Sequence, residues 1–226
     1  MIRQMPEIDR FKQKICDLLM KETAVCRTIK TLKNNSIYVA GDKDDLVYFI
    51  EGGQVKLLIL SPEGKECILA IHSGGDIFGE LCIGGLGERL ETAIAMTDTQ
   101  LKAIPAAEFL GYLNKESLLD GFVQYLALRV AEQQHIIASL VVVDSEKRLG
   151  NTLLELARSR GKQDPRSIRI ELALSCQELA AMIGRTHSWV DLSMQKFHAL
   201  GLIETSEQDY IIVKERKLVE HLAYIT

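Results

Sequence analysis

The longest regular pattern of apolar positions lies between Ser117 and Asp144. Apolar residues recur there at steps of three and four, the period of one face of an α-helix. They are Leu118, Phe122, Tyr125, Leu126, Val130, Ile136, Ile137, Leu140 and Val143. Such a helix would be roughly 40 Å long, and its polar residues make it unsuitable for a membrane span. The pattern predicts a connecting helix that pairs with its twin in a homodimer; packing on its own domain is the alternative.

The residues before this helix change from a helical period to a strand period. Residues 7–27 are predicted to be helical, with apolar side chains on one side. From Ile29 onward, short segments rich in β-branched and aromatic residues alternate with turn residues such as Ser61-Pro62-Glu63-Gly64. About ten residues separate these segments, which indicates an antiparallel sandwich or barrel. Pro105 then opens a short helix that leads into the long one.

The residues after the long helix again favour helices. An amphipathic helix is predicted to end at Gly161, and alternating residues 167–172 predict a strand. Ser175 and Glu178 have the spacing of a capping box, which predicts that a helix begins there.

A second helix is predicted to follow a tight turn at Gly184, with Thr186 as its N-cap. A β-hairpin around residues 206–209 completes the pattern. Helix, glycine turn, helix and hairpin together predict a winged helix-turn-helix.

Composition excludes several classes of protein. The net charge is −4, but residues from Lys147 onward have twelve Lys and Arg against ten Asp and Glu, which weakly favours nucleic acid at that end. Five cysteines without a C-x-x-C pair argue against a disulfide framework or zinc knuckle. We find no signal peptide and expect a cytoplasmic protein. No nucleophile–base pair, carboxylate dyad or metal motif is present, so an enzyme is not expected.

One loop of the predicted barrel, Asp76–Arg89, contains four glycines in its last eleven residues. Glycines allow backbone N–H groups to approach a ligand closely or to form a concave anion site. Glu80 can accept hydrogen bonds from a sugar hydroxyl, and Arg89 can neutralise a phosphate. In the alternative interpretation, the glycines serve tight turns and Glu80 and Arg89 form a surface ion pair.

The sequence G-D-x-F-G-E-L followed by E-R resembles the phosphate-binding cassette of the cyclic-AMP receptor protein/fumarate-nitrate regulator (CRP/FNR) superfamily. The order of elements is similar over essentially the whole chain. The resemblance implies that Glu80, between Gly79 and Leu81, holds a ribose and that Arg89 holds a cyclic phosphate. Leu90 stands where the family has Ser or Thr, so one hydroxyl donor to the phosphate is missing.

The resemblance also implies effector contacts on the long helix. Arg129 matches an arginine of the cyclic-AMP receptors, and Gln133 and Gln134 match two adenine-contacting hydroxyl residues. Amide side chains both donate and accept, so they could bind a base edge; fixing the register of a coiled coil is the alternative. His72 and His135 are candidate metal or haem ligands, with ordinary hydrogen-bonding roles as the alternative.

The predicted recognition helix departs from the family's S-R-E-T-V-S-R. Here Leu192 replaces a cation, and Asp191 brings a negative charge towards the phosphates. Trp189 could contact sugar or thymine methyl groups, or could face the core or a partner. The candidate DNA-binding residues are Ser175, Gln177, Arg185, Thr186, His187, Ser188, Trp189 and Lys196.

The sequence therefore predicts an α+β protein with three parts: an effector-binding β-barrel of the cyclic-nucleotide-binding type, a jelly roll, at 1–116, a dimerisation helix and hinge at 117–145, and a winged helix-turn-helix at 146–226. The expected function is a ligand-gated, dimeric transcription regulator that binds promoter DNA, contacts RNA polymerase and senses a cyclic nucleotide or another small anionic effector. The alternatives are a sensor or interaction protein whose winged helix has lost ordinary DNA binding, and a redox or haem-type sensor of the same superfamily.

Overall fold

The computed structural model describes residues 6–21, 26–85, 87–164, 167–170, 174–205 and 210–225, and the chain forms two compact units, 1–133 and 134–226. The long helix α3 (Leu119–Val142) begins in the first unit and ends in the second. The sequence predicted three parts, 1–116, 117–145 and 146–226, with separate roles in effector binding, dimerisation and DNA binding. That assignment stays a prediction.

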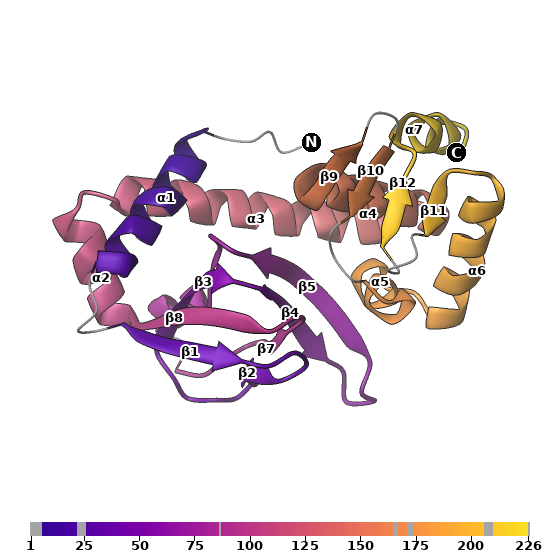
Figure 1. Ribbon diagram of the computed structural model, residues 1–226. Coiled ribbons are helices and arrows are strands. Elements are labelled where there is room, and N and C mark those ends of the chain that lie inside the picture. Colours follow the sequence, from indigo (N-terminus) through magenta and orange to yellow (C-terminus); the bar gives the residue numbers. More distant parts are fainter. Residues whose placement is uncertain are drawn as a thin grey trace. The chain divides into compact units, whose positions relative to one another are not determined.

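The N-terminal unit contains two four-stranded antiparallel sheets that form the predicted barrel (Figure 1). One sheet has the order β1-β8-β3-β6 and the other β2-β7-β4-β5. Their strands are β1 (Arg27–Thr31), β2 (Ser36–Tyr38), β3 (Leu46–Gly52), β4 (Gln54–Leu60), β5 (Glu66–Ser73), β6 (Ile77–Phe78), β7 (Thr92–Ala95) and β8 (Thr99–Pro105). The turn at 61–64 joins β4 and β5 as predicted, with Gly64 at φ 78°.

Two further helices, α1 (Pro6–Lys21) and α2 (Ala106–Lys115), pack on the barrel. The helix predicted over 7–27 is confirmed as far as Lys21; residues 22–25 lie outside the described residues, and Arg27 already belongs to β1. Ile15 of α1 and Phe109 of α2 are buried in one cluster together with Ile77 of β6. This apolar cluster fixes the two helices to the barrel.

The first half of α3 has a partner within its own unit, which corrects part of the sequence interpretation. Leu118, Phe122 and Tyr125 are buried in the cluster with α1 and α2, so they cannot form a seam with a second subunit. The Phe11 and Phe122 rings lie 6.2 Å apart. The apolar residues exposed along α3 are a different set: Leu119, Val123, Val130, Ile137, Leu140, Val141 and Val142. Each described helix is too short or too polar to cross a membrane.

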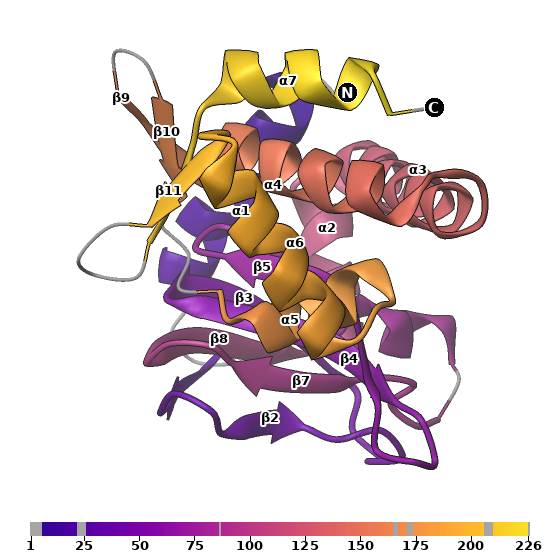
Figure 2. The ribbon, with the colours of Figure 1, turned by 90° about the vertical axis from the view of Figure 1, so that its right-hand side faces the viewer.

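The C-terminal unit is a winged helix-turn-helix, shown in Figure 2. Its helices after α3 are α4 (Ser145–Arg160), α5 (Cys176–Ile183), α6 (His187–Ala199) and α7 (Glu215–Ala223). A sheet of order β11-β12-β10-β9 contains β9 (Gly161–Asp164), β10 (Ser167–Ile170), β11 (Ile203–Thr205) and β12 (Ile211–Val213). The hairpin turn predicted at 206–209 and the end of the strand predicted at 167–172 lie outside the described residues.

Local capping signals set the helix boundaries of this unit. Ser175 and Glu178 form the predicted capping box, and Gly184 ends α5 in the left-handed conformation. The Thr186 hydroxyl accepts a hydrogen bond from the Trp189 N–H and so begins α6. Asp144 caps α4 in the same way, because its carboxylate accepts from the N–H groups of residues 146 and 147. The two helix starts predicted at Ser175 and Thr186 are therefore confirmed, whereas the cap at Asp144 was not predicted.

Candidate functional site

The cassette loop Asp76–Arg89 contains a glycine, Gly79, that no other residue could replace without rearrangement. Gly79 has φ 77°, and a Cβ there would lie 2.9 Å from Arg89 Nη1 and 3.1 Å from the Leu46 carbonyl oxygen. Glu80 follows it and opens a short 3₁₀ helix, η1 (Glu80–Gly84). Burial raises the pKa of the Glu80 carboxyl above its ordinary value, although a backbone hydrogen bond and the nearby Arg129 and Arg89 oppose the shift.

Arg89 is an interior residue, contrary to the interpretation of a surface ion pair with Glu80. Its side chain is 2% exposed and pairs with Asp44, which lies in the loop before β3. Nη1 donates to the Gly79 carbonyl oxygen at 2.7 Å, and Nη2 donates to Asp44 and to the Leu46 carbonyl oxygen. The guanidinium also lies 4.2 Å from the centre of the Tyr38 ring.

One nitrogen of the guanidinium has no acceptor in the described part of the chain. Arg89 Nε is buried and has no hydrogen-bond partner among the residues that the structure describes. Both hydrogens of Nη2 already have internal acceptors, so an anionic ligand could bind Nη2 only by replacing Asp44 or the Leu46 carbonyl oxygen. A bidentate oxyanion would also satisfy Nε. Arg89 is therefore suited to bind an anion that takes the place of the Asp44 carboxylate.

Two features of the same region do not suit a cyclic phosphate. Leu90 is half-exposed and cannot donate a hydrogen bond, as expected from its sequence. Glu91 is buried and accepts a hydrogen bond from the Tyr38 hydroxyl at 2.9 Å. Burial and this carboxylate raise the pKa of Tyr38, so the hydroxyl stays protonated and keeps donating. A second buried carboxylate near the cassette reduces the attraction for a phosphate.

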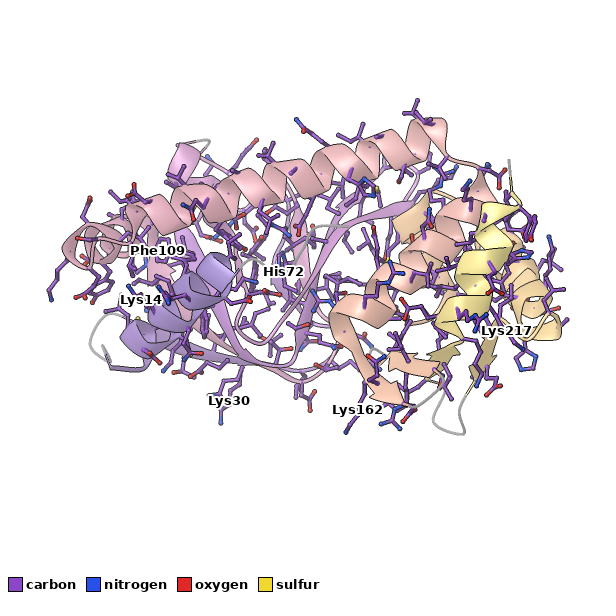
Figure 3. All side chains as sticks on the ribbon, turned by 90° about the horizontal axis from the view of Figure 1, so that it is seen from above. Lys14, Lys30, His72, Phe109, Lys162 and Lys217 are labelled. Atoms are coloured by element: carbon purple, nitrogen blue, oxygen red, sulfur yellow. The ribbon has the colours of Figure 1, made fainter. Side chains whose placement is uncertain are left out.

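A polar network joins the barrel to α1 and α3. His72, which is labelled in Figure 3, is buried with 2% of its surface exposed, and its Nε2 lies 3.2 Å from Nη2 of Arg129. Because a guanidinium only donates, Nε2 accepts and the proton is on Nδ1, which faces Asp76 at 3.8 Å. Lys12 binds Asp76 at 2.6 Å. Burial opposes ionisation of Asp76, but His72 and Lys12 outweigh it and hold the pKa well below its usual range.

The remaining effector candidates lie on or near the cassette and on α3. Leu81 is exposed. Arg129 pairs with Glu132 at 3.1 Å, and Gln133 donates to the Leu69 carbonyl oxygen at 3.4 Å. Gln134 is exposed and belongs to the second unit. Among the N-terminal residues the structure therefore brings together Gly79, Glu80, Arg89 and Arg129. The charged residues around them, Asp44 and Glu91, were not among the predicted site residues.

The two candidate metal or haem ligands have different surroundings. His72 takes part in the buried network, whereas His135 is exposed, with its Nε2 3.5 Å from Glu155. The described residues contain no group of three or more His, Cys, Asp or Glu side chains that could hold a metal ion. Both histidines thus make polar contacts with protein side chains, as in the alternative interpretation that gives them ordinary hydrogen-bonding roles.

The candidate DNA-binding residues surround the turn between α5 and α6. Ser175, Gln177, Thr186, His187 and Ser188 are exposed.

The cations of this region already have internal contacts. Arg185 Nε donates to the Ser145 hydroxyl at 2.6 Å, and its guanidinium lies 5.8 Å from the centre of the half-buried Trp189 ring. Lys196 pairs with Glu146 of α4 at 2.7 Å.

Comparison with known proteins gives one family match within each of the two units. A family model described as a cyclic nucleotide-binding domain matches residues 29–116, and one described as a Crp-like helix-turn-helix domain matches residues 147–221. The global nitrogen regulator of Synechocystis is 30% identical over 84% of this chain and 82% of its own length. This chain belongs to the CRP/FNR family of transcription regulators.

Other CRP/FNR members respond to different signals. A CRP-like cAMP-activated global transcriptional regulator of Mycobacterium tuberculosis is 25% identical over 82% of this chain and 84% of its own length. The structure of a CooA mutant from Carboxydothermus hydrogenoformans is 26% identical, with a TM-score of 0.76 over 91% of this chain and 90% of that chain. CRP/FNR regulators bind DNA and act as dimers, and these relatives are regulators, not enzymes.

Sequence reasoning missed several residues of this CRP/FNR barrel. Asp44, Tyr38 and Glu91 contact or surround the cassette arginine, and none of them belongs to the motif that identified it. Glu91 had a usable signal, because alternate residues of an extended segment point to the same side and it stands two places after Arg89. Asp44 had none, since 45 residues separate it from Arg89.

Proposed function

We propose that this protein is a ligand-gated homodimeric transcription regulator, and that its effector is a small anionic molecule such as a cyclic nucleotide or a carboxylate. The observation that supports the effector class is the buried Arg89, which has an orphan Nε donor and an internal carboxylate that an anion could replace. The proposed target is promoter DNA, with RNA polymerase as the further partner.

The proposed effector site combines the cassette with residues of α3. Its residues are Gly79, Glu80, Leu81, Arg89, Leu90, Arg129, Gln133 and Gln134. The effector's anionic group would replace Asp44 on Arg89, and the neighbouring Glu80 would accept a hydrogen bond from an effector hydroxyl. Because the effector's anion would take the place of the Asp44 carboxylate, the net gain in free energy is the difference between the binding free energies of these two anions on Arg89.

The proposed dimer seam is the exposed apolar side of α3. Val123, Val130 and Ile137 are exposed, recur every seven residues and would occupy the a positions of a heptad. Leu119, Leu126, Gln133 and Leu140 would occupy the d positions, although Leu126 also packs, half-buried, against the cluster of its own unit. β-branched residues at a with leucine at d favour a parallel two-stranded coiled coil. The single polar residue in this seam is a glutamine, which suits either a register role or an effector contact.

The seam can be tested by placing a charge in it. Ile137→Glu should shift the protein from dimer to monomer in sedimentation, because an uncompensated buried charge costs about 3–5 kcal/mol. Ile59→Glu, at an exposed position of β4, is the matched control and should leave the dimer intact. An Ile137→Glu dimer of unchanged affinity would contradict the proposed seam.

Gating is tested by a thermodynamic cycle. Cyclic nucleotides and small carboxylates are first screened for thermal stabilisation of the protein, and DNA affinity is then measured with and without the molecule that stabilises it. We expect a coupling of about 1–3 kcal/mol, equal in both directions. Gln133→Ala with Gln134→Ala should reduce the coupling more than it reduces DNA affinity without effector. Equal DNA affinity with and without a bound effector would exclude gating.

A further inference from the structure

The outward side of the recognition helix α6 has an apolar centre. At about 100° per residue, Ser188, Leu192, Gln195 and Ala199 lie on the side opposite the buried Val190 and Phe197. Leu192 is 67% exposed, in the second turn of the helix. In Figure 2 α6 lies in front of the other helices of its own unit. The side chain with the most apolar surface on this outward side is therefore a leucine.

The cationic side chains near this surface contact other residues of the same unit. Arg185 donates to Ser145 and lies beside Trp189, and Lys196 pairs with Glu146. Within α6 itself, Gln195 Nε2 donates to Asp191 at 3.1 Å. No cationic side chain lies on the outward side formed by residues 188, 192, 195 and 199.

In the major groove, apolar and cationic side chains recognise different bases. Arginine or lysine reads guanine through N7 and O6, whereas an apolar side chain contacts the C5 methyl group of thymine. A leucine pressed against a guanine or adenine edge would leave buried polar atoms without hydrogen bonds, which costs free energy. The chemistry of the outward side of α6 therefore favours thymine opposite Leu192.

We propose that Leu192 is a specificity-determining residue that contacts the C5 methyl group of one thymine in each operator half-site. This inference rests on the proposed DNA binding of a dimer and adds which base the second turn of α6 reads. It also gives a role to the position where the family usually has a cation.

The test begins with selection of duplexes from a random library by the full-length dimer at low salt and micromolar protein concentration. Since gating is worth about 1–3 kcal/mol, the protein without effector still binds under these conditions. Each thymine of the selected operator is then replaced by deoxyuridine, which removes only the methyl group. We expect one position per half-site to lose about fourfold in affinity, and both together about fifteenfold.

The same series is repeated with Leu192→Ala, which should bind the thymine and deoxyuridine operators equally. Leu200→Ala removes another exposed leucine at the end of α6 and should keep the deoxyuridine effect. The inference is overturned if no deoxyuridine position weakens binding by the wild type, or if Leu192→Ala keeps the effect. Failure to select any duplex would overturn the proposed function, and the inference with it.

Discussion

The barrel and the winged helix hold their arginines in opposite ways. Arg89 of the barrel is buried against a carboxylate, two carbonyl oxygens and an aromatic ring. Arg185 of the winged helix is exposed, donates to a serine hydroxyl and lies near the Trp189 ring. An anionic ligand that took the place of Asp44 on Arg89 would exchange one anionic partner for another, whereas a DNA phosphate could approach the exposed Arg185 by displacing only a neutral hydroxyl.

This difference predicts different physical behaviour at the two sites. Exchange of one anion for another in a buried place changes the total charge little and is weakly screened by salt. Neutralisation of DNA phosphates by exposed cations releases counterions and depends steeply on salt. If both proposed ligands bind, the barrel would distinguish between anions with little dependence on salt, and the winged helix would bind a polyanion with a steep dependence on salt.

The largest expected contrast is in stability. Arg89→Leu should lower the free energy of unfolding by about 3 kcal/mol, because it leaves Asp44 without its cation and removes the hydrogen bonds to Gly79 and Leu46. Arg185→Leu should cost less than about 1 kcal/mol, since it removes one hydrogen bond at an exposed side chain. Urea unfolding of both variants measures the contrast. Equal losses would show that burial does not separate the two arginines.

A smaller effect is expected in acid. The pKa of Asp76 is held below its ordinary value of 3.8, so its ionised form stabilises the folded state above that pH. This contribution is lost as the pH falls below about 4 towards the folded-state pKa. Asp76→Asn should therefore be destabilised by about 2 kcal/mol at neutral pH and should lose less stability than the wild type on acidification.

Unfolding of Asp76→Asn and wild type between pH 2.5 and 7, roughly the range in which carboxylates titrate, is the measurement. Glu63→Gln, at an exposed turn position, is the control and should follow the wild type. Parallel stability curves for Asp76→Asn and the wild type would contradict the role of the Lys12–Asp76–His72 network.

The winged helix was predictable in detail because its signals are local. Ser175 and Glu178 are three residues apart, and Gly184 and Thr186 act on the helices that they adjoin. The barrel hairpin at 61–64 was predictable for the same reason. The extra helix α7 was missed, since its sequence has no capping side chain at Lys214.

The partners of the functional residues could not be predicted, because they come from distant parts of the chain. Arg89 was recognised from its motif, but its pairing with Asp44 depends on how the loop before β3 passes the cassette. The apolar pattern of residues 118–143 identified α3 correctly, yet periodicity alone cannot assign each apolar residue to its own domain or to a partner subunit. Contact with α1 decides that Phe122 and Tyr125 are interior.

The smallest effect concerns the number of ions released on DNA binding. If Arg185 binds a phosphate, Arg185→Gln should make the slope of log affinity against log salt shallower by about one for each phosphate that is no longer neutralised, with a uniform decrease in affinity across sequences. Lys196→Gln should change the slope less, because Lys196 is already paired with Glu146 before DNA arrives. Lys65→Gln, on an exposed turn of the barrel, should not change it. Titrations of the three variants and the wild type at several salt concentrations give the slopes. A slope unchanged in Arg185→Gln would show that the hydrogen bond to Ser145 persists on DNA, and that the exposed arginine of the winged helix is structural like the buried one of the barrel.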